Sequence, residues 1–368
     1  MPMLMQLAIT GLLVALLPLA VVWVSSDADK YRKLVWVTLF LTFDLIMFGA
    51  FTRLTDSGLG CPDWPGCYGQ ANPLQAHADI SAAQAAMPTG PVTVIKAWIE
   101  MIHRYLAMTV GLLIVALVVI AWRRWIQSKH RQMKFSPWFP TVLLAFVCLQ
   151  GAFGAWTVTM KLQPVIVTTH LLLGLGLLAL LTWFGARQAE NAPVADAALS
   201  LRTPAALALW LLAIQIGLGG WVSTNYAALA CTDFPLCHDA LLPQMDFANG
   251  FTLWRDLGKT GAGDYLPFAA LTAIHWAHRS FAFVVVFVVA WAGYWAQRID
   301  GLRSTGRWLL IAIALQLGTG VASIFLKWPL ALAVLHNGGA ALLVLLLVML
   351  NYKARIPAGA AFARATAA

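Results

Sequence analysis

The chain has 368 residues, of which 61% are hydrophobic and only 11% are charged, and its formal net charge is +9. Soluble domains usually carry about a quarter charged residues, so this composition excludes a water-soluble globule. The Lys and Arg residues are spread along the sequence instead of forming one clustered basic face, which argues against a nucleic-acid partner.

In chain order, nine apolar runs approach the roughly 20 residues that an α-helix needs to cross a bilayer core. Because lipid satisfies no backbone hydrogen bonds, these runs predict membrane-spanning helices. They cover residues 5–25, 34–53, 104–122, 141–160, 164–184, 205–223, 278–297, 308–326 and 330–351. We therefore predict an all-α polytopic membrane protein with an eight-span core and one extra N-terminal hydrophobic span.

The first run resembles a signal peptide in length, but it lacks a basic n-region and a convincing small-residue cleavage site. We interpret it as a retained span with its N-terminus outside. Together with the loop that follows, it forms the segment 1–33 that precedes the core.

The distribution of Lys and Arg predicts the orientation, because short cytoplasmic loops retain positive charge. The two longest loops, roughly 54–99 and 224–274, are nearly free of basic residues and are predicted to face the periplasm. The basic residues of the opposite, cytoplasmic side are Lys30, Arg32, Lys33, Arg123, Arg124, Lys129, Arg131, Lys134, Arg187, Arg202, Arg298, Arg303, Arg307, Lys353 and Arg355. We expect a multi-pass protein of the bacterial cytoplasmic (inner) membrane, with a cytoplasmic tail at 356–368.

An internal repeat is visible in the sequence. GAFTRLTDSGLGCPDWPGC (49–67) aligns without a gap with GGWVSTNYAALACTDFPLC (219–237), at an offset of 170 residues. Further matches are His103-Arg104 with His278-Arg279, Leu149-Gln150 with Leu315-Gln316, Gly154 with Gly320, and His170 with His336. With an even number of spans in each half, the repeat is parallel. It predicts two four-helix bundles, at 34–190 and 191–355.

Each half carries a C-x5-C motif in a predicted outer loop, formed by Cys61 and Cys67 and by Cys231 and Cys237. In an oxidising compartment such pairs favour disulfides. Two alternatives remain open: a metal site that includes His238, and a thiol pair that cycles during electron transfer.

Four of the eight histidines fall at predicted outer ends of spans, namely His103, His170, His278 and His336. In each half, the first is expected where the second helix begins and the other about two turns into the fourth helix. Facing histidines in a four-helix bundle are typical of bis-histidine haem ligation. A single histidine at such a place is more often an interfacial residue, but two repeated pairs favour ligands.

Further polar residues surround these positions. Arg104 and Arg279 follow a predicted ligand, where a guanidinium can pair with a haem propionate or, alternatively, reach lipid phosphate. We predict that these two arginines, His275 and Arg53 lie around the ligands without binding iron themselves. His275 is also an alternative ligand to His278, because the two are three residues apart on one helical face.

Glu100 marks the clearest difference between the halves, because E-x-x-H-R at 100–104 aligns with H-x-x-H-R at 275–279. A carboxylate one turn from a haem ligand could stabilise positive charge on a porphyrin substituent or accept a proton. The alternative is charge complementarity at the N-terminus of a helix.

The sequence resembles the haem A synthase family over about residues 34–351. The segments that carry the resemblance are GAFTRLTDSGLGCPDWPGC, WIEMIHRYLA (98–107), VTTHLLLG (167–174), IHWAHRSFA (274–282) and VLHNGGA (334–340). The resemblance implies an oxidoreductase that converts the C8 methyl of haem O to a formyl group. It implies ligation of substrate haem by His103 with His170, a haem b held by His278 with His336, catalysis by Glu100, and a disulfide in each outer loop.

Two other classes of protein compete with this interpretation. A dihaem b-type cytochrome that only relays electrons needs the four histidines but not Glu100. A parallel-repeat transporter explains the duplication, but it predicts broken helices in the middle of the membrane. As partners we expect the lipid bilayer, haem O and haem A, an unidentified electron acceptor, the haem O-producing farnesyltransferase and, as an open case, a second copy of the chain.

Overall fold

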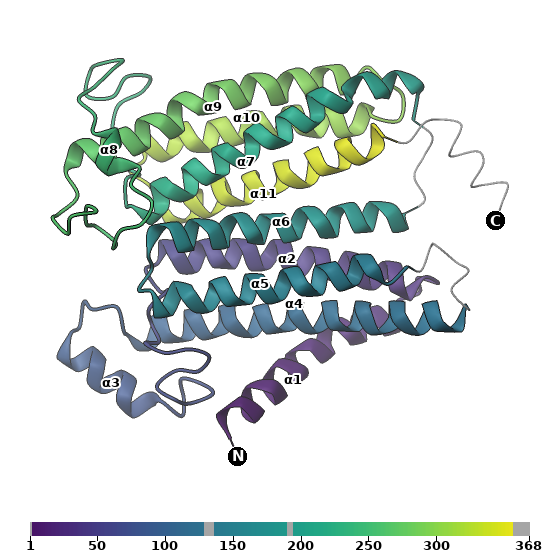
Figure 1. Cartoon of the computed structure of the whole chain (residues 1–368), viewed down its shortest axis with the longest axis horizontal. Helices are drawn as coiled ribbons and strands as arrows, with labels where there is room; N and C mark the ends of the chain where they lie inside the picture. Colours follow the sequence, from purple (N-terminus) through teal and green to yellow (C-terminus); the bar gives the residue numbers. More distant parts are fainter. Residues whose placement is uncertain (1, 129–135, 190–193, 356–368) are drawn as a thin grey trace. The chain divides into compact units, whose positions relative to one another are not determined.

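A computed structural model of the protein describes residues 2–128, 136–189 and 194–355. Within them it contains helices and no β-sheet, and nine helical segments are long and apolar enough to cross a membrane. They are α1 (Met3–Val24), α2 (Lys30–Leu54), α4 (Val94–Gln127), α5 (Trp138–Thr159), α6 (Pro164–Gln188), α7 (Arg202–Thr224, preceded by the 3-10 turn η2, Asp196–Leu201), α9 (Phe268–Ala296), α10 (Arg303–Phe325) and α11 (Leu330–Lys353). The predicted all-α membrane class is therefore confirmed (Figure 1).

Two helices begin about ten residues earlier than their apolar runs. Helix α4 begins at Val94, where the Thr93 side chain caps the Lys96 N–H, and α9 begins at Phe268. The prediction that His103 and His278 stand where these helices begin is therefore wrong, because each lies more than two turns inside. Lys96 and Glu100 had excluded this first part of α4 from the hydrophobic run, although a helical backbone continues through it.

The long loops also contain short helices that hydropathy did not predict. Helix α3 (His77–Ala86) lies in the first long loop, and the single turn α8 (Phe247–Gly250) lies in the second. Asp246 caps α8 by accepting the Asn249 N–H.

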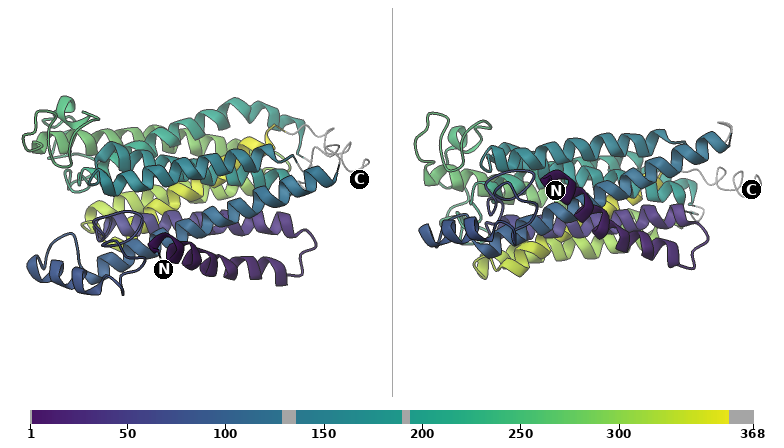
Figure 2. Two further views of the ribbon diagram at one scale, coloured as in Figure 1. Left: turned by 60° about the horizontal axis from the view of Figure 1, so that its bottom comes forward. Right: turned by 90° about the horizontal axis from the view of Figure 1, so that it is seen from below.

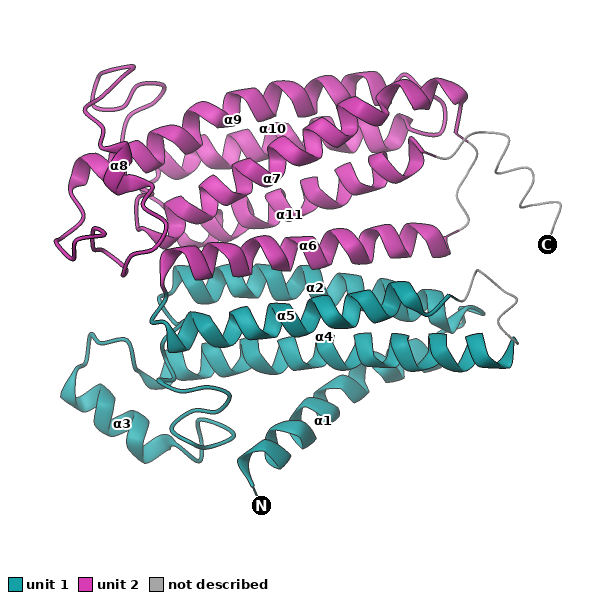
Figure 3. Cartoon of the chain, viewed as in Figure 1, with its two compact units in different colours: residues 1–162 teal, residues 163–368 magenta. Residues whose placement is uncertain are grey.

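The chain forms two compact units, residues 1–162 and 163–368 (Figure 3). The predicted halves, 34–190 and 191–355, divide the chain at another place, and this functional division stays a prediction. The basic residues Lys129, Arg131 and Lys134 and the predicted tail 356–368 lie outside the described residues.

In unit 1, α4 packs against α1, α2 and α5. The extra helix α1 runs obliquely to α4 (Figures 1 and 2). Its first turns reach the loop that carries the first cysteine pair, where Leu7 is buried with Cys61 and Cys67 and Met3 packs beside them. The N-terminal end of α1 therefore lies at the same end of unit 1 as this loop.

In unit 2, four helices form a closed ring in which α7 contacts α9 and α11, and α10 contacts the same two helices. Helices α9 and α11 thus lie across the ring from each other. One close approach is made possible by Gly306 of α10, where an added Cβ would lie 2.3 Å from the Gln297 nitrogen. Asn351 of α11 donates to the Ala205 carbonyl of α7 at 2.8 Å, the kind of interhelical hydrogen bond that stabilises membrane bundles. Helix α6 packs on the outside of this ring, against α7 and α11.

Candidate functional site

Each predicted outer loop is closed by its own disulfide. Cys61 is bonded to Cys67 and Cys231 to Cys237, and in both pairs the Cα atoms are 4.9 Å apart, within the range that a disulfide requires. The predicted pairing is confirmed. The disulfide takes up both sulfur atoms that a metal site with His238 would need, and His238 Nε2 lies 2.8 Å from the Ala230 carbonyl.

An aspartate organises each of these loops in the same way. The Asp63 carboxylate accepts the backbone N–H groups of Tyr68 and Gly69 at 2.6 and 2.8 Å. The Asp233 carboxylate accepts those of His238 and Asp239 at 2.9 and 3.0 Å. The pKa of Asp233 lies below its ordinary value. Partial burial alone would raise it, but the N–H groups that the carboxylate accepts stabilise the charged form more strongly.

Each arginine that follows a predicted ligand donates hydrogen bonds to the cysteine loop of its own unit. Arg104 donates to the carbonyl oxygens of Asp63, Pro65 and Gly66. Arg279 donates to those of Asp233 and Leu236. From sequence, both guanidinium groups could pair with a haem propionate or reach lipid phosphate. The Arg104 guanidinium instead has protein partners on both terminal nitrogens, whereas Nη1 of Arg279 is buried without a hydrogen-bond partner among the described residues.

Glu100 is 3% exposed and joins the first loop to α4. Its Oε2 accepts the Cys61 N–H at 2.8 Å, and its Oε1 accepts from Arg104 at 2.5 Å. In unit 2 the aligned His275 does the equivalent work, because its Nδ1 accepts the Cys231 N–H at 3.1 Å. The two chemically different residues therefore share one structural role, which the sequence alignment did not reveal.

In unit 1, His103 lies against α2. An added Cβ on Gly49 would lie 3.0 Å from His103 Cε1, and the Phe48 ring stacks at 6.3 Å from the imidazole. His170 lies in the second turn of α6 and belongs to unit 2. The pairing of His103 with His170 stays a prediction from sequence.

In unit 2, the two predicted haem b ligands lie on the helices that face each other across the ring. His278 of α9 packs on Gly219 of α7, and His336 of α11 packs on Gly320 of α10. An added Cβ at these glycines would lie 3.0 and 3.1 Å from the Cε1 atoms of the respective histidines. The small residues thus leave room for the Cε1 edge of an imidazole against each neighbouring helix.

Three polar side chains reach these two rings, and only Gln316 among them was noted from the sequence, as the repeat match of Gln150. The Gln215 amide lies 3.1 Å from His278 Nδ1, and the Thr319 hydroxyl lies 2.9 Å from His336 Nδ1. Gln316 Nε2 lies 3.3 Å from His336 Nε2. For Gln215 and Thr319 the only available signal was their spacing, since Gln215 lies one helical turn before Gly219 and Thr319 lies next to Gly320.

These residues fit a bis-histidine haem. Two imidazoles from opposite helices match the axial ligand set of such a haem, and the glycines provide a cradle that any larger side chain would fill. The buried Arg279 Nη1 is an unused donor that suits a propionate, and the Gln215 and Gln316 Oε1 atoms are buried acceptors without partners.

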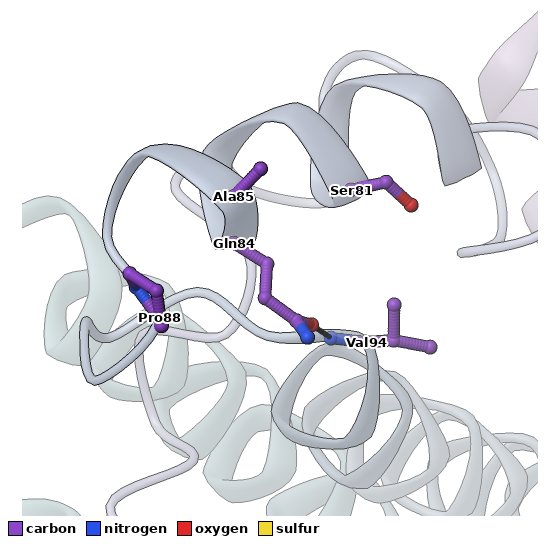
Figure 4. A pocket seen from close by; sticks show the side chains of 5 residues that line it. All are labelled: Ser81, Gln84, Ala85, Pro88 and Val94. Carbon is purple, nitrogen blue, oxygen red and sulfur yellow. Dashed lines mark hydrogen bonds between the residues drawn. The ribbon is translucent and has the colours of Figure 1, made fainter.

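Arg53, the remaining predicted site residue, forms a 3.1 Å ion pair with Asp56 at the end of α2. A separate surface pocket is lined by Ser81, Gln84, Ala85, Pro88 and Val94, and the Gln84 side chain accepts the Val94 N–H there (Figure 4). This pocket contains none of the predicted site residues.

Fold and site together define a multi-pass α-helical membrane protein with disulfide-closed loops and histidines packed on glycines of neighbouring helices. The chain belongs to the COX15-CtaA family, described as "Cytochrome oxidase assembly protein", which matches residues 32–348.

Curated relatives agree with this membership. The chain is 40% identical over 326 residues to a "Heme A synthase" of Shewanella oneidensis, covering 87% of this chain and 96% of that protein. It is 28% identical to proteins of the same name from Caulobacter sp. (strain K31), over 91% of this chain and 99% of the relative, and from Bradyrhizobium diazoefficiens, over 89% and 92%.

Proposed function

We propose that this protein is a haem A synthase, an oxidoreductase that converts the C8 methyl of haem O to a formyl group and so supplies haem A for oxidase assembly. Family membership and the relatives of that name support this function. One structural observation links this function to named residues. The Glu100 carboxylate is buried and lies one helical turn before the predicted ligand His103.

We propose that the two halves divide the work. His103 and His170 hold the iron of haem O in the N-terminal half, and His278 and His336 hold a haem b in the C-terminal half. A bis-histidine haem b supplies one-electron transfer to the reaction. The opposed helices α9 and α11 and the glycine cradles support the second assignment. The equivalent contacts of the two cysteine loops support the proposed duplication of the chain.

Oxidation of a methyl carbon develops positive charge on that carbon, so a fixed anion lowers the energy of the transition state more than that of the substrate. Glu100 is the buried anion available in the first half, and two hydrogen bonds fix its orientation. Because His275 offers a neutral acceptor at the aligned place, the second half lacks this anion and suits electron transfer.

His278 is preferred over His275 as the haem b ligand. His275 is 5% exposed and its Nδ1 accepts the Cys231 N–H, so in the neutral ring the hydrogen lies on Nε2 and leaves no lone pair there for iron. His278 instead lies against Gly219 on the neighbouring helix of the ring.

We further propose the inner-membrane orientation in which both cysteine loops face the periplasm, on the basis of the positively charged loops at the opposite ends of the spans. Haem O is insoluble in water, so direct transfer from the farnesyltransferase that makes it is the proposed route of entry. The electron acceptor is a separate partner.

The test is to express the chain in a haem O-producing bacterium that makes no haem A, purify the protein and identify the extracted haems. Haem A or haem O together with haem b supports the proposed function. Haem b alone would instead indicate a dihaem cytochrome that relays electrons. Absence of any haem would favour the transporter interpretation.

A further inference from the structure

The Thr319 hydroxyl lies where it can accept a hydrogen bond from Nδ1–H of His336. The Thr319 hydroxyl donates its single hydrogen to the Gln316 carbonyl at 3.0 Å, so at 2.9 Å it accepts from the His336 Nδ1–H. Gln316 Nε2 lies 3.3 Å from His336 Nε2, where iron would bind, so this contact is given up when a haem occupies the site. The Thr319 contact favours the tautomer in which Nε2 carries the lone pair that can bind iron.

Gln215 reaches the same edge of the opposite ring. Its amide nitrogen lies 3.1 Å from both Nδ1 and the carbonyl oxygen of His278, while its Oε1 is buried without a partner. When Nδ1 carries the hydrogen, Gln215 accepts from it only after a half-turn of the amide that exchanges its two terminal atoms and gives up the hydrogen bond to the His278 carbonyl. With that arrangement Nε2 of His278 also carries the free lone pair.

The aligned positions of the first half hold different chemistry. At the repeat offsets, Gln215 aligns with Leu45 and Thr319 aligns with Phe153, whose ring packs at 5.0 Å on Trp156. Neither Leu45 nor Phe153 has a side-chain atom that can accept a hydrogen bond from an imidazole. The neighbouring positions do not change: Gly219 and Gly320 align with Gly49 and Gly154, and Gln316 aligns with Gln150.

We propose that Gln215 and Thr319 are positioning residues of the second half, which hold the Nδ1 edges of His278 and His336 and direct both Nε2 atoms at the haem b iron. This inference rests on the proposed haem b site. In the second half, Gln215 and Thr319 hold the ligand rings, and the aligned Leu45 and Phe153 of the first half cannot accept the same hydrogen bonds. This difference suits a permanent cofactor in the second half and an exchanging substrate in the first.

A measurable electronic effect follows. A hydrogen bond accepted from Nδ1–H makes the imidazole a stronger electron donor and stabilises ferric over ferrous iron. Removing the acceptor therefore raises the midpoint potential of haem b, and releasing the ring from a fixed rotation changes the low-spin g values. A side chain that contributed only to packing would change neither quantity when replaced by an isostere.

The experiment compares full-length wild type, His278→Ala, Thr319→Val and Thr319→Ser, with Gln215→Leu as a second probe of the opposite ligand. Haem b content, redox titration and electron paramagnetic resonance are measured on the purified membrane protein. In Thr319→Val we expect at least a threefold rise in the ratio of reduced to oxidised haem b at fixed potential, equivalent to about 28 mV for one electron. Thr319→Ser should restore the wild-type potential, and Gln215→Leu should shift it in the same direction as Thr319→Val.

The outcomes separate the two proposals. If His278→Ala keeps the native haem b spectrum, the proposed haem b site is wrong. If His278→Ala loses haem b while Thr319→Val and Gln215→Leu keep the wild-type potential and g values, only the positioning role is overturned. If Thr319→Val does not fold, Thr319→Ser and Gln215→Leu decide the question by the same two measurements.

Discussion

Glu100 Oε2 lies 2.8 Å from the backbone nitrogen of Cys61, so the proposed catalytic carboxylate also anchors the first disulfide loop. His275 anchors Cys231 in the second loop by the same kind of contact, at 3.1 Å. The chain thus contains its own example of an imidazole that performs the anchoring without a carboxylate. This makes histidine the appropriate substitution for separating structure from catalysis at position 100.

We predict that Glu100→His retains the Cys61–Cys67 disulfide and haem b but lowers haem A output at least about a hundredfold, the usual effect of losing one preorganised electrostatic group. Haem O or a partly oxidised haem should accumulate. Extracted haems are quantified by chromatography and mass spectrometry. Glu100→Gln, which keeps the shape and removes the charge, should behave in the same way, and a normal haem A yield from both variants would refute the catalytic assignment.

The separate disulfides give a second prediction. Mass spectrometry of unreduced protein should find Cys61 joined to Cys67 and Cys231 joined to Cys237, with Cys148 as the free thiol. The double substitution Cys61→Ser, Cys67→Ser should lower stability by about 2 kcal/mol, because a short loop loses its covalent closure. Disulfides between the two loops in freshly isolated protein would contradict the pairing.

The choice between neighbouring histidines is tested by His275→Ala and His278→Ala. His278→Ala should abolish the low-spin haem b spectrum. His275→Ala should retain it, while the Cys231 N–H loses its acceptor at a cost of about 1–3 kcal/mol in stability. Absorption spectra and thermal unfolding of both variants are compared, and the opposite spectral result would assign the ligand to His275.

Gly320 and Gly318 form a matched pair within α10. An added Cβ at Gly320 lies 3.1 Å from His336 Cε1, whereas one at Gly318 meets nothing within 4 Å. Gly320→Ala should displace the imidazole and lower the haem b content. Gly318→Ala should leave haem b unchanged and stabilise the helix by up to about 1 kcal/mol. Equal haem b content in the two variants would show that the cradle at Gly320 is not required.

The sequence by itself determined those features that depend on contiguous residues. Hydropathy predicted all nine spans, because each crossing of a bilayer needs one uninterrupted apolar run. The two C-x5-C motifs predicted local disulfides, since six positions of separation already keep the paired cysteines close together. Hydropathy was less informative for the early turns of α4 and α9, because a helix can continue into polar surroundings where apolar composition no longer marks it.

Only the tertiary structure decided what the polar side chains contact. Glu100 meets Cys61 across 39 positions, and Gln215 meets His278 across 63. The Arg104 guanidinium, for which the sequence suggested a propionate or lipid phosphate, binds carbonyl oxygens of the first loop. Residue types and spacing restrict which hydrogen bonds are possible, but which donor reaches which acceptor depends on how helices pack and where loops fold back. That information is carried by contacts between distant segments, and no local pattern in the sequence contains it.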